Sequence, residues 1–240
     1  MRNSETDNLA VLIDSDNAQA SIIEELLGEV AQYGVATIKR AYGDWTTPNL
    51  SSWKETLNTH AIQPIQQFAY TNGKNATDSA LIIDAMDLLH GGKVDGFCLV
   101  SSDSDFTRLA TRIRESGLAV YGFGEKKTPK AFVSACNKFI YTEILRKPSV
   151  DSPPVVVKVD PKLKTMLQSA VSAAAQEDGW ANLGTVGQLL SKQDSSFDAR
   201  NYGFKKLSDL IKSQSYLELK SEKVSKESQN IRFYVRAKET

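Results

Sequence analysis

The first 145 residues alternate between two hydrophobic patterns, one typical of buried strands and the other of amphipathic helices. Short apolar runs occur at 9–14, 96–101 and 118–123, and between them apolar residues recur at the three- and four-residue spacing of a helix face. Strands and helices in alternation predict a mostly parallel sheet between two helical layers, an α/β fold of three layers. Further strands are expected at 35–42, 62–70 and 139–141.

Glycine and proline mark the expected ends of several elements. Gly34, Gly91 and Gly117 each follow a helical pattern, and glycine commonly ends a helix. Pro129 is expected to open another helix, and Pro64 favours a place at the edge of the sheet for its strand. The helical patterns cover roughly 18–32, 50–59, 76–91, 104–116 and a segment after Pro129.

A change of pattern near residue 145 predicts a second domain. Prolines and serines between 146 and 160 are typical of a linker, and Pro161 then suits the first turn of a helix. Three helical patterns followed by two alternating segments predict a winged-helix-like α+β domain over 161–238, behind a first domain over 1–145. Its expected elements are helices at 161–174, 184–192 and 202–213, and a hairpin of 216–220 with 231–236.

The composition is ordinary for a soluble globular protein and excludes neither an enzyme nor a binding module. The chain has 240 residues, of which 41% are hydrophobic and 24% charged, and its net charge is zero. The charge is uneven, since residues 161–240 carry 13 Lys and Arg against 9 Asp and Glu, and residues 1–160 carry 16 against 20. A basic rear part suits a nucleic-acid partner without proving one.

The sequence shows neither a basic and apolar leader nor an apolar run near the roughly 20 residues of a membrane span. Its two cysteines, Cys98 and Cys136, lie in apolar patterns and are expected to be buried thiols rather than a disulfide. We therefore expect a cytoplasmic protein without a membrane part.

Carboxylates directly follow two of the apolar runs. Asp14 ends the segment at 9–14 and Asp16 follows it, and Asp103 and Asp105 follow the run at 96–101. The carboxyl ends of parallel strands are where ligands bind in open α/β sheets, so these acids are expected to meet. Two unit charges about 4 Å apart repel by roughly 4 kcal/mol at an effective dielectric near 20, which favours a bound cation. Oxygen ligands without histidine or thiolate suit Mg²⁺ or Mn²⁺.

Each of these polar residues also has a purely structural interpretation. Ser102 and Asp105 have capping-box spacing, Asn17 suits the N-cap of the first helix, and Asp16 suits an Asx turn. Asp78 falls in the first turn of a helix, where a carboxylate is favourable without any ligand. Two acids further along that helix are expected to face solvent or to fix packing, Asp84 and Asp87.

Two other kinds of catalytic site are disfavoured. His60 and His90 are the only histidines and neither lies beside a candidate nucleophile in the sequence, which argues against Ser-His-Asp or Cys-His chemistry. Gly117, Gly122 and Gly124 lack the spacing of a phosphate-binding loop.

Three segments of the front domain, 13–17, 74–78 with Asp84-Ala85, and 100–106, resemble motifs of the NYN domains, relatives of the PIN nucleases, in their LabA-like group. The resemblance covers about 8–143 and implies a PIN-like sheet and metal-dependent cleavage of RNA phosphodiesters. Ser102 departs from the family, which usually has glycine there. The resemblance implies that Asp14, Asp78 and Asp103 hold the ion, that Asp105 assists directly or through water, and that Asn17 orients substrate or a water on the ion.

Two segments of the rear domain, 179–183 and 197–207, resemble the LOTUS (OST-HTH) modules, winged-helix-like RNA binders. The match covers about 160–237. A nuclease-like domain joined to such a module is a known arrangement in these families, and it implies RNA as the partner of both domains. A protein partner of the LOTUS module and a homodimer stay open.

Two groups of basic and aromatic residues are candidates for contacts to RNA. Lys126, Lys127 and Lys130 follow the run at 118–123 on the predicted ligand edge, although a solvated patch explains them equally well. The rear group combines phosphate pairing with base stacking and consists of Arg200, Tyr202, Lys205 and Lys206. Three apolar residues near it are expected in the core, Trp180, Leu207 and Leu210.

Three functions fit these observations. The preferred one is a ribonuclease that uses Mg²⁺ or Mn²⁺. The second is a nuclease-like scaffold that binds RNA or a partner without cleaving. The third is a haloacid-dehalogenase-type phosphatase, because Asp14 and Asp16 have the spacing of its nucleophile motif, but the Gly-Thr that should follow Asp16 is missing.

Overall fold

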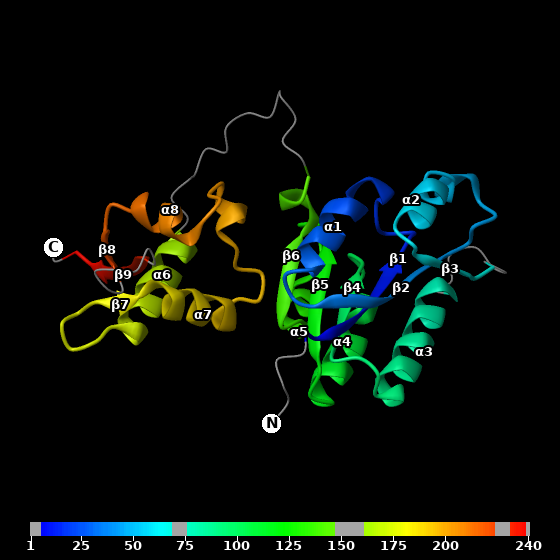
Figure 1. Cartoon of the computed structure of the whole chain (residues 1–240), viewed down its shortest axis with the longest axis horizontal. Helices are drawn as coiled ribbons and strands as arrows, with labels where there is room; N and C mark the ends of the chain where they lie inside the picture. The colour runs from blue at the N-terminus through cyan, green and yellow to red at the C-terminus, as the bar shows by residue number, and fades with distance from the viewer. Residues whose placement is uncertain (1–5, 69–75, 147–160, 224–230, 239–240) are drawn as a thin grey trace. The chain divides into compact units, whose positions relative to one another are not determined.

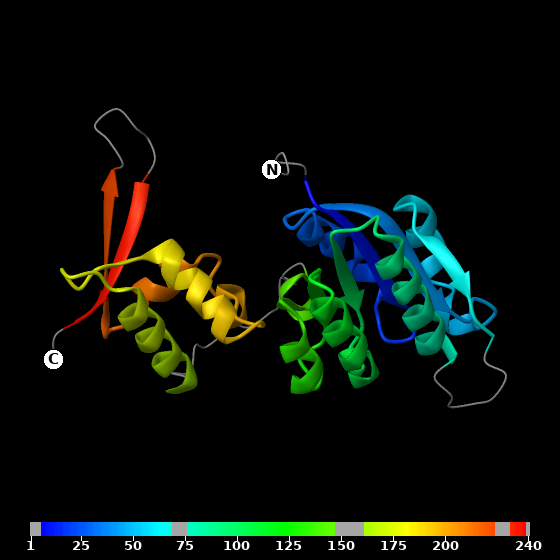
Figure 2. The same ribbon diagram turned by 90° about the horizontal axis from the view of Figure 1, so that it is seen from below.

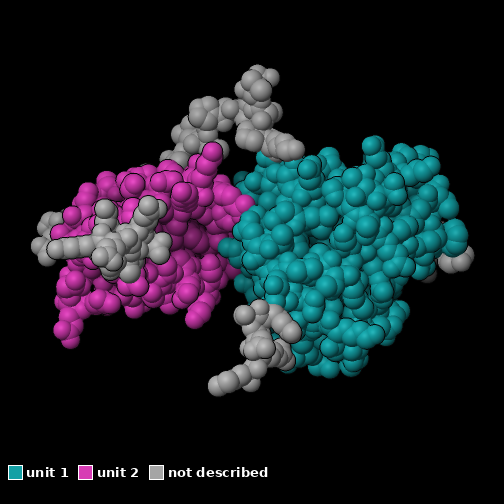
Figure 3. Space-filling view, viewed as in Figure 1, with its two compact units in different colours: residues 1–147 teal, residues 148–240 magenta. Residues whose placement is uncertain are grey.

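The computed structural model describes residues 6–68, 76–146, 161–223 and 231–238. The chain divides into two compact units, residues 1–147 and 148–240, which Figure 3 shows in different colours. Residues 147–160, most of the predicted linker, lie outside the described part. Within the described ranges, no helix is both long and apolar enough to span a lipid bilayer.

The first unit is built on a six-stranded sheet in which all neighbouring strands run parallel (Figure 1). Its strands are β1 (Asn8–Asp14), β2 (Val35–Gly43), β3 (Gln63–Gln66), β4 (Gly96–Val100), β5 (Ala119–Gly124) and β6 (Lys138–Tyr141). The order across the sheet is β3-β2-β1-β4-β5-β6, so the chain runs outward from β1 to β3 and then returns to β4 on the other side of β1. The point between β1 and β4 is the topological switch point, where open α/β sheets bind ligands.

Helices cover both faces of this sheet (Figure 2). Side chains that alternate along β1 enter two separate cores. Leu9, Val11 and Ile13 pack with one helical layer, and Ala10 and Leu12 with the other. Burial on both faces explains the continuous apolar runs of β1 and β4. The predicted three-layer α/β fold is confirmed. The first layer contains α1 (Ile23–Val30) and α2 (Trp53–Thr59), and the second contains α3 (Ala76–Gly91), α4 (Thr107–Glu115) and α5 (Lys130–Ala135).

Two details of the first unit test predictions made from the sequence. β3, which contains Pro64, forms an edge of the sheet, so that prediction is confirmed. α1 begins later than predicted, because the chain first makes a turn in which the backbone N–H groups of Asn17 and Ala18 donate to the carbonyl of Asp14 at 3.3 and 2.9 Å. A short 3-10 helix, η1 (Ala20–Ile22), joins this turn to α1.

The second unit packs helices on a three-stranded antiparallel sheet of order β7-β9-β8. The predicted helix over 202–213 is interrupted, because Gly203 has φ 83° and ends the 3-10 helix η5 (Ala199–Tyr202) before α8 begins. β7 was not predicted, since two residues are too few to show alternation. The elements are α6 (Pro161–Ala174), β7 (Ala181–Asn182), α7 (Leu183–Gln193), α8 (Leu207–Lys212), β8 (Leu217–Lys223) and β9 (Ile231–Ala237).

Candidate metal centre at the carboxyl edge of the parallel sheet

The carboxyl ends of β1 and β4 lie side by side at the switch point. Ile13 pairs with Val100 in the parallel ladder, so the next residues, Asp14 and Ser101, lie side by side where the two strands end. The structure therefore brings together two polar segments that are 87 residues apart in the sequence.

Asp14 is fully buried, with 0% of its surface exposed, and its carboxylate accepts three hydrogen bonds. Oδ2 accepts from the Asn17 amide at 2.8 Å and from the Ser101 hydroxyl at 2.7 Å, and Oδ1 accepts from the Asp16 backbone N–H at 3.2 Å. A carboxylate has about four acceptor positions, so one remains on Oδ1. The N-cap interpretation of Asn17 is wrong, because Gln19 occupies the cap of η1 and the Asn17 side chain instead holds Asp14.

Ser101 is a site residue that sequence reasoning missed. Its hydroxyl donates to Asp14 and also accepts from the Asp103 backbone N–H at 3.1 Å. One buried side chain thus links the ends of both central strands. The spacing in the sequence gives no sign of this role, since a serine after a strand is common in turns.

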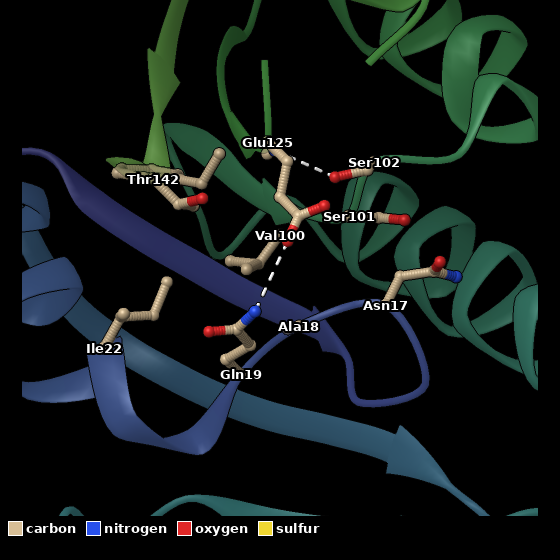
Figure 4. Close-up of a pocket in the computed structure, with 11 residues that line it drawn as sticks. Asn17, Ala18, Gln19, Ile22, Val100, Ser101, Ser102, Glu125 and Thr142 are labelled. Carbon is tan, nitrogen blue, oxygen red and sulfur yellow. Dashed lines mark hydrogen bonds between the residues drawn. The ribbon is translucent and has the colours of Figure 1, made fainter. Parts of the chain in front are cut away.

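Asp103 caps the 3-10 helix η3 (Ser104–Phe106), since its carboxylate accepts from the Asp105 backbone N–H at 2.9 Å. The predicted capping box of Ser102 and Asp105 is wrong. Instead, the Ser102 hydroxyl accepts from the Glu125 backbone N–H at 2.9 Å and ties the end of β4 to the end of β5 (Figure 4).

Asp78, Asp103 and Asp105 form what we call the acidic cluster. One carboxylate oxygen from each lies within 4.8 Å of the others, which is close enough for a shared cation. Asp78 comes from the first turn of α3 and the other two follow β4, so the cluster joins two elements around the sheet edge. Asp14 belongs to the same edge but is not among these three.

Burial and electrostatic repulsion both act on Asp78. Burial first, and then repulsion from Asp14 and the other carboxylates of this edge, raises the pKa of Asp78 to about 6. Burial also raises the pKa of Asp14, although the hydrogen bonds from Ser101 and Asn17 act in the opposite direction. The electrostatic coupling between Asp78 and Asp14 supports their placement at one site. A divalent cation would remove the repulsion.

The donor set fits Mg²⁺ or Mn²⁺. It consists of carboxylate oxygens alone, with no histidine or cysteine in the cluster. Hard oxygen ligands are those that these ions prefer, whereas zinc and copper favour nitrogen and sulfur.

The three predicted lysines lie beyond β5, at the same edge of the sheet, and all are exposed. Lys127 pairs with Glu125 at 2.8 Å, and the backbone N–H of Lys126 donates to Glu143. Lys130 begins α5. Glu125 also accepts from the Gln19 amide at 3.4 Å, beside a small water-sized pocket (Figure 4). The charge of this patch is therefore partly neutralised.

In the second unit, two of the predicted RNA-binding side chains already have partners. Arg200 forms a two-point ion pair with Asp198, at 3.0 and 2.7 Å, and the ring of Tyr202 packs on Phe197. Lys205 and Lys206 are exposed. Among the residues expected in the core, Leu210 is buried and Leu207 is partly buried. Trp180 is partly exposed, with Lys220 and Arg236 4.4 and 4.6 Å from its ring centroid.

A contact whose partners were not predicted from the sequence anchors α3. Asp84 accepts hydrogen bonds from both Arg40 and Tyr42 of β2, which confirms that it fixes packing. Burial first, and then the bond to Asp84, raises the pKa of the Tyr42 hydroxyl. Because Tyr42 pairs with Asp14 in the sheet, this network ties α3 to the strand beside the acidic cluster.

A parallel sheet of this order, with carboxylates at its switch point, defines the first unit as a PIN-like α/β domain. A family model for the NYN domain matches residues 8–145, and one for the OST-HTH/LOTUS domain matches residues 156–228. The chain belongs to the NYN domain family and carries an OST-HTH/LOTUS domain behind the NYN domain. Both families are associated with RNA.

Several solved structures are similar to parts of the chain, and no curated protein matches it. A protein of unknown function from Vibrio parahaemolyticus is 19% identical over 58% of this chain and 94% of that one, with a TM-score of 0.49. An uncharacterized protein of Nitrosomonas europaea is 32% identical over 39% and 87%, with a TM-score of 0.31. A protein segment from Chromobacterium violaceum is 34% identical over 35% and 87%, with a TM-score of 0.26.

Proposed function

We propose that this protein is a ribonuclease that hydrolyses RNA phosphodiesters with Mg²⁺ or Mn²⁺ at the acidic cluster. The observation that carries the proposal is the meeting of Asp78, Asp103 and Asp105 within 4.8 Å at the switch point of the sheet. Membership of the NYN family supports it. The domains are proposed as residues 1–145 for the nuclease and 161–238 for the RNA-binding module, in a cytoplasmic protein.

Each residue has a distinct part in the proposed mechanism. The acidic cluster holds the cation, and Asp14 assists from the end of β1 at the same edge of the sheet. Asn17 and Ser101 keep the Asp14 carboxylate in place through their bonds at 2.8 and 2.7 Å. When bound, the ion supplies charge stabilisation at the phosphate and makes a water more acidic. Lys126, Lys127 and Lys130 approach the RNA backbone on the side of β5.

The OST-HTH/LOTUS domain is proposed to hold the RNA through Lys205 and Lys206, whose exposed ammonium groups suit phosphates. Arg200 and Tyr202 would shape this surface through Asp198 and Phe197 rather than reach RNA as free groups. A second binding site on the same chain raises the local RNA concentration at the nuclease domain.

Each of the two rival functions makes a requirement that separates it from the proposed enzyme. A phosphatase of the haloacid-dehalogenase type needs an accessible Asp14 to attack phosphate, whereas this carboxylate is fully buried and hydrogen-bonded. An RNA-binding scaffold without catalysis needs no cation at the acidic cluster, so metal binding and cleavage separate it from the proposed enzyme.

The test of the proposed site is a set of three variants. Asp14→Asn and Asp103→Asn should abolish RNA cleavage while the melting temperature shows a folded protein. Asp87→Asn, an exposed acid further along α3, is the matched control and should cleave normally. Unchanged cleavage in both site variants would refute the proposed mechanism.

A further inference from the structure

A polar hollow lies on the α1 and α2 side of the carboxyl edge. It measures about 660 Å³ and is formed by the turn after β1 and by the segment from the 3-10 helix η2 (Pro48–Leu50) into α2. Ser15 and Asp16, which directly follow the buried Asp14, form one wall. Its volume lies within the range of small-molecule binding sites.

The lining of this hollow suits a neutral ligand rich in hydroxyl and amide groups. Leu50 and Trp53 supply apolar surface, and Asp16 is the single charged side chain in the lining. No lysine or arginine lines it, so a phosphate group has no cation to bind there. The other polar residues in the lining are Ser15, Gln19, Ser21, Asn49, Ser52 and Thr56.

Ser15 provides a second, independent indication of a ligand. Only 2% of its surface is exposed, its backbone N–H donates to Tyr42 at 3.0 Å, and its hydroxyl has no hydrogen-bond partner among the described residues. Buried hydroxyl groups in native proteins nearly always have a hydrogen-bond partner. A ligand in the hollow would supply the partner that the Ser15 hydroxyl lacks.

We propose that this hollow binds the ribose and base of the nucleotide next to the scissile phosphate, and that the Ser15 hydroxyl bonds to the ribose. The proposal rests on the proposed ribonuclease function. A serine side chain has one heavy-atom torsion, so a rotamer change turns its hydroxyl toward a ligand in the hollow. A bond to the ribose 2′-hydroxyl would distinguish RNA from DNA at this position. The phosphate itself stays at the acidic cluster, and Ser15 directly follows Asp14, which lies at the same edge of the sheet.

Photocross-linking tests the occupant without requiring catalysis. A short single-stranded RNA with 4-thiouridine at its central positions is bound in the presence of chelator, irradiated and mapped by mass spectrometry. Cross-links to residues 15–21 or 49–56 are expected, and their absence would overturn the proposal. If these residues are cross-linked but the protein does not cleave RNA under any condition, the proposed RNA-binding hollow is supported and the proposed ribonuclease function is refuted.

Two matched variants test the hollow in solution. Ser52→Tyr fills it from an exposed position and should weaken binding of the same RNA at least fivefold, whereas Ser51→Tyr, at the exposed neighbour that lines a different hollow, should bind like the wild type. Ser15→Ala should reduce the preference for RNA over an oligonucleotide with one central 2′-deoxy sugar. Equal binding by both tyrosine variants, or an unchanged sugar preference in Ser15→Ala, would contradict the proposal.

Discussion

The hydroxyl of Ser101 donates to Asp14 Oδ2 at 2.7 Å and so joins the ends of the two central strands. The Ser101 hydroxyl oxygen also accepts a hydrogen bond from the Asp103 backbone N–H, so one side chain holds both the acid that ends β1 and the acid that follows β4. Residues that hold a metal ligand in place commonly change metal affinity or activity by 10–100-fold when they are removed. Ser101 is therefore a positioning residue of the candidate centre.

Ser101→Ala should lower metal-dependent cleavage by about 10-fold or more, because Asp14 loses one of its three hydrogen bonds and turns more freely. Isothermal titration with Mn²⁺ should show weaker binding by a similar factor. Ser104→Ala removes an exposed hydroxyl three residues away and serves as the control. Equal metal affinity in the two variants would show that Ser101 does not position the metal ligands.

The raised pKa of Asp78 predicts how the metal-free protein responds to pH. Its pKa is about 6 in the folded protein and near 3.8 in the unfolded chain, so the folded state binds the extra proton between these values. The free energy of unfolding should therefore fall as pH rises from about 4 to about 6. Urea titrations in chelator should show a smaller fall for Asp78→Asn than for the wild type.

Metal should reverse this effect. A cation at the acidic cluster stabilises the folded protein at pH 7 by mass action, and more so than at pH 5, where Asp78 is largely protonated. Melting curves with and without Mn²⁺ at both pH values measure the difference. Equal shifts at pH 5 and pH 7 would show that Asp78 does not take part in binding.

Asp84→Ala should destabilise the nuclease domain by about 2 kcal/mol, because it leaves the hydroxyl of Tyr42 and the guanidinium of Arg40 without this acceptor. The expected order in urea denaturation is wild type, then Asp87→Ala with little change, then Asp84→Ala. Cleavage by Asp84→Ala should also decrease, since α3 carries Asp78. A stability equal to that of Asp87→Ala would show that the contact contributes nothing.

The double variant Lys205→Ala with Lys206→Ala should weaken binding to single-stranded RNA and flatten its salt dependence. Each phosphate contact contributes about 0.7 to the slope of log affinity against log salt, so two lost contacts lower it by about 1.4. Fluorescence anisotropy at several salt concentrations gives the slope. Lys192→Ala, an exposed lysine of α7, is the control, and an identical slope in both variants would place RNA elsewhere.

The fold was largely accessible from the sequence because each central strand is buried on both faces. Such strands appear as continuous apolar runs, and the acids at their ends mark the ligand edge directly. The positions of Asp14, Asp78 and Asp103 follow from local features, a strand end or a first helical turn. This information is present within a few residues of each acid.

The contacts among side chains could not be predicted in the same way. Ser101 meets Asp14 because Ile13 and Val100 share a register, and Asp84 meets Tyr42 across 42 residues, and neither pairing leaves a local signal. The assignment of the cap to Ser102 was wrong for another reason. Both Ser102 and Asp103 can accept a backbone N–H, and the position of Glu125 decides between them.

The central claim is that carboxylates from separate parts of the chain bind a divalent ion, and that the protein hydrolyses RNA with this ion. The most direct measurement is cleavage of a labelled RNA, with the matching DNA beside it, in Mg²⁺, in Mn²⁺ and in chelator, by the wild type and by Asp103→Asn. The account predicts cleavage of RNA by the wild type in either ion, and none in chelator or by the variant. Cleavage that persists in chelator, or that Asp103→Asn retains, would contradict it.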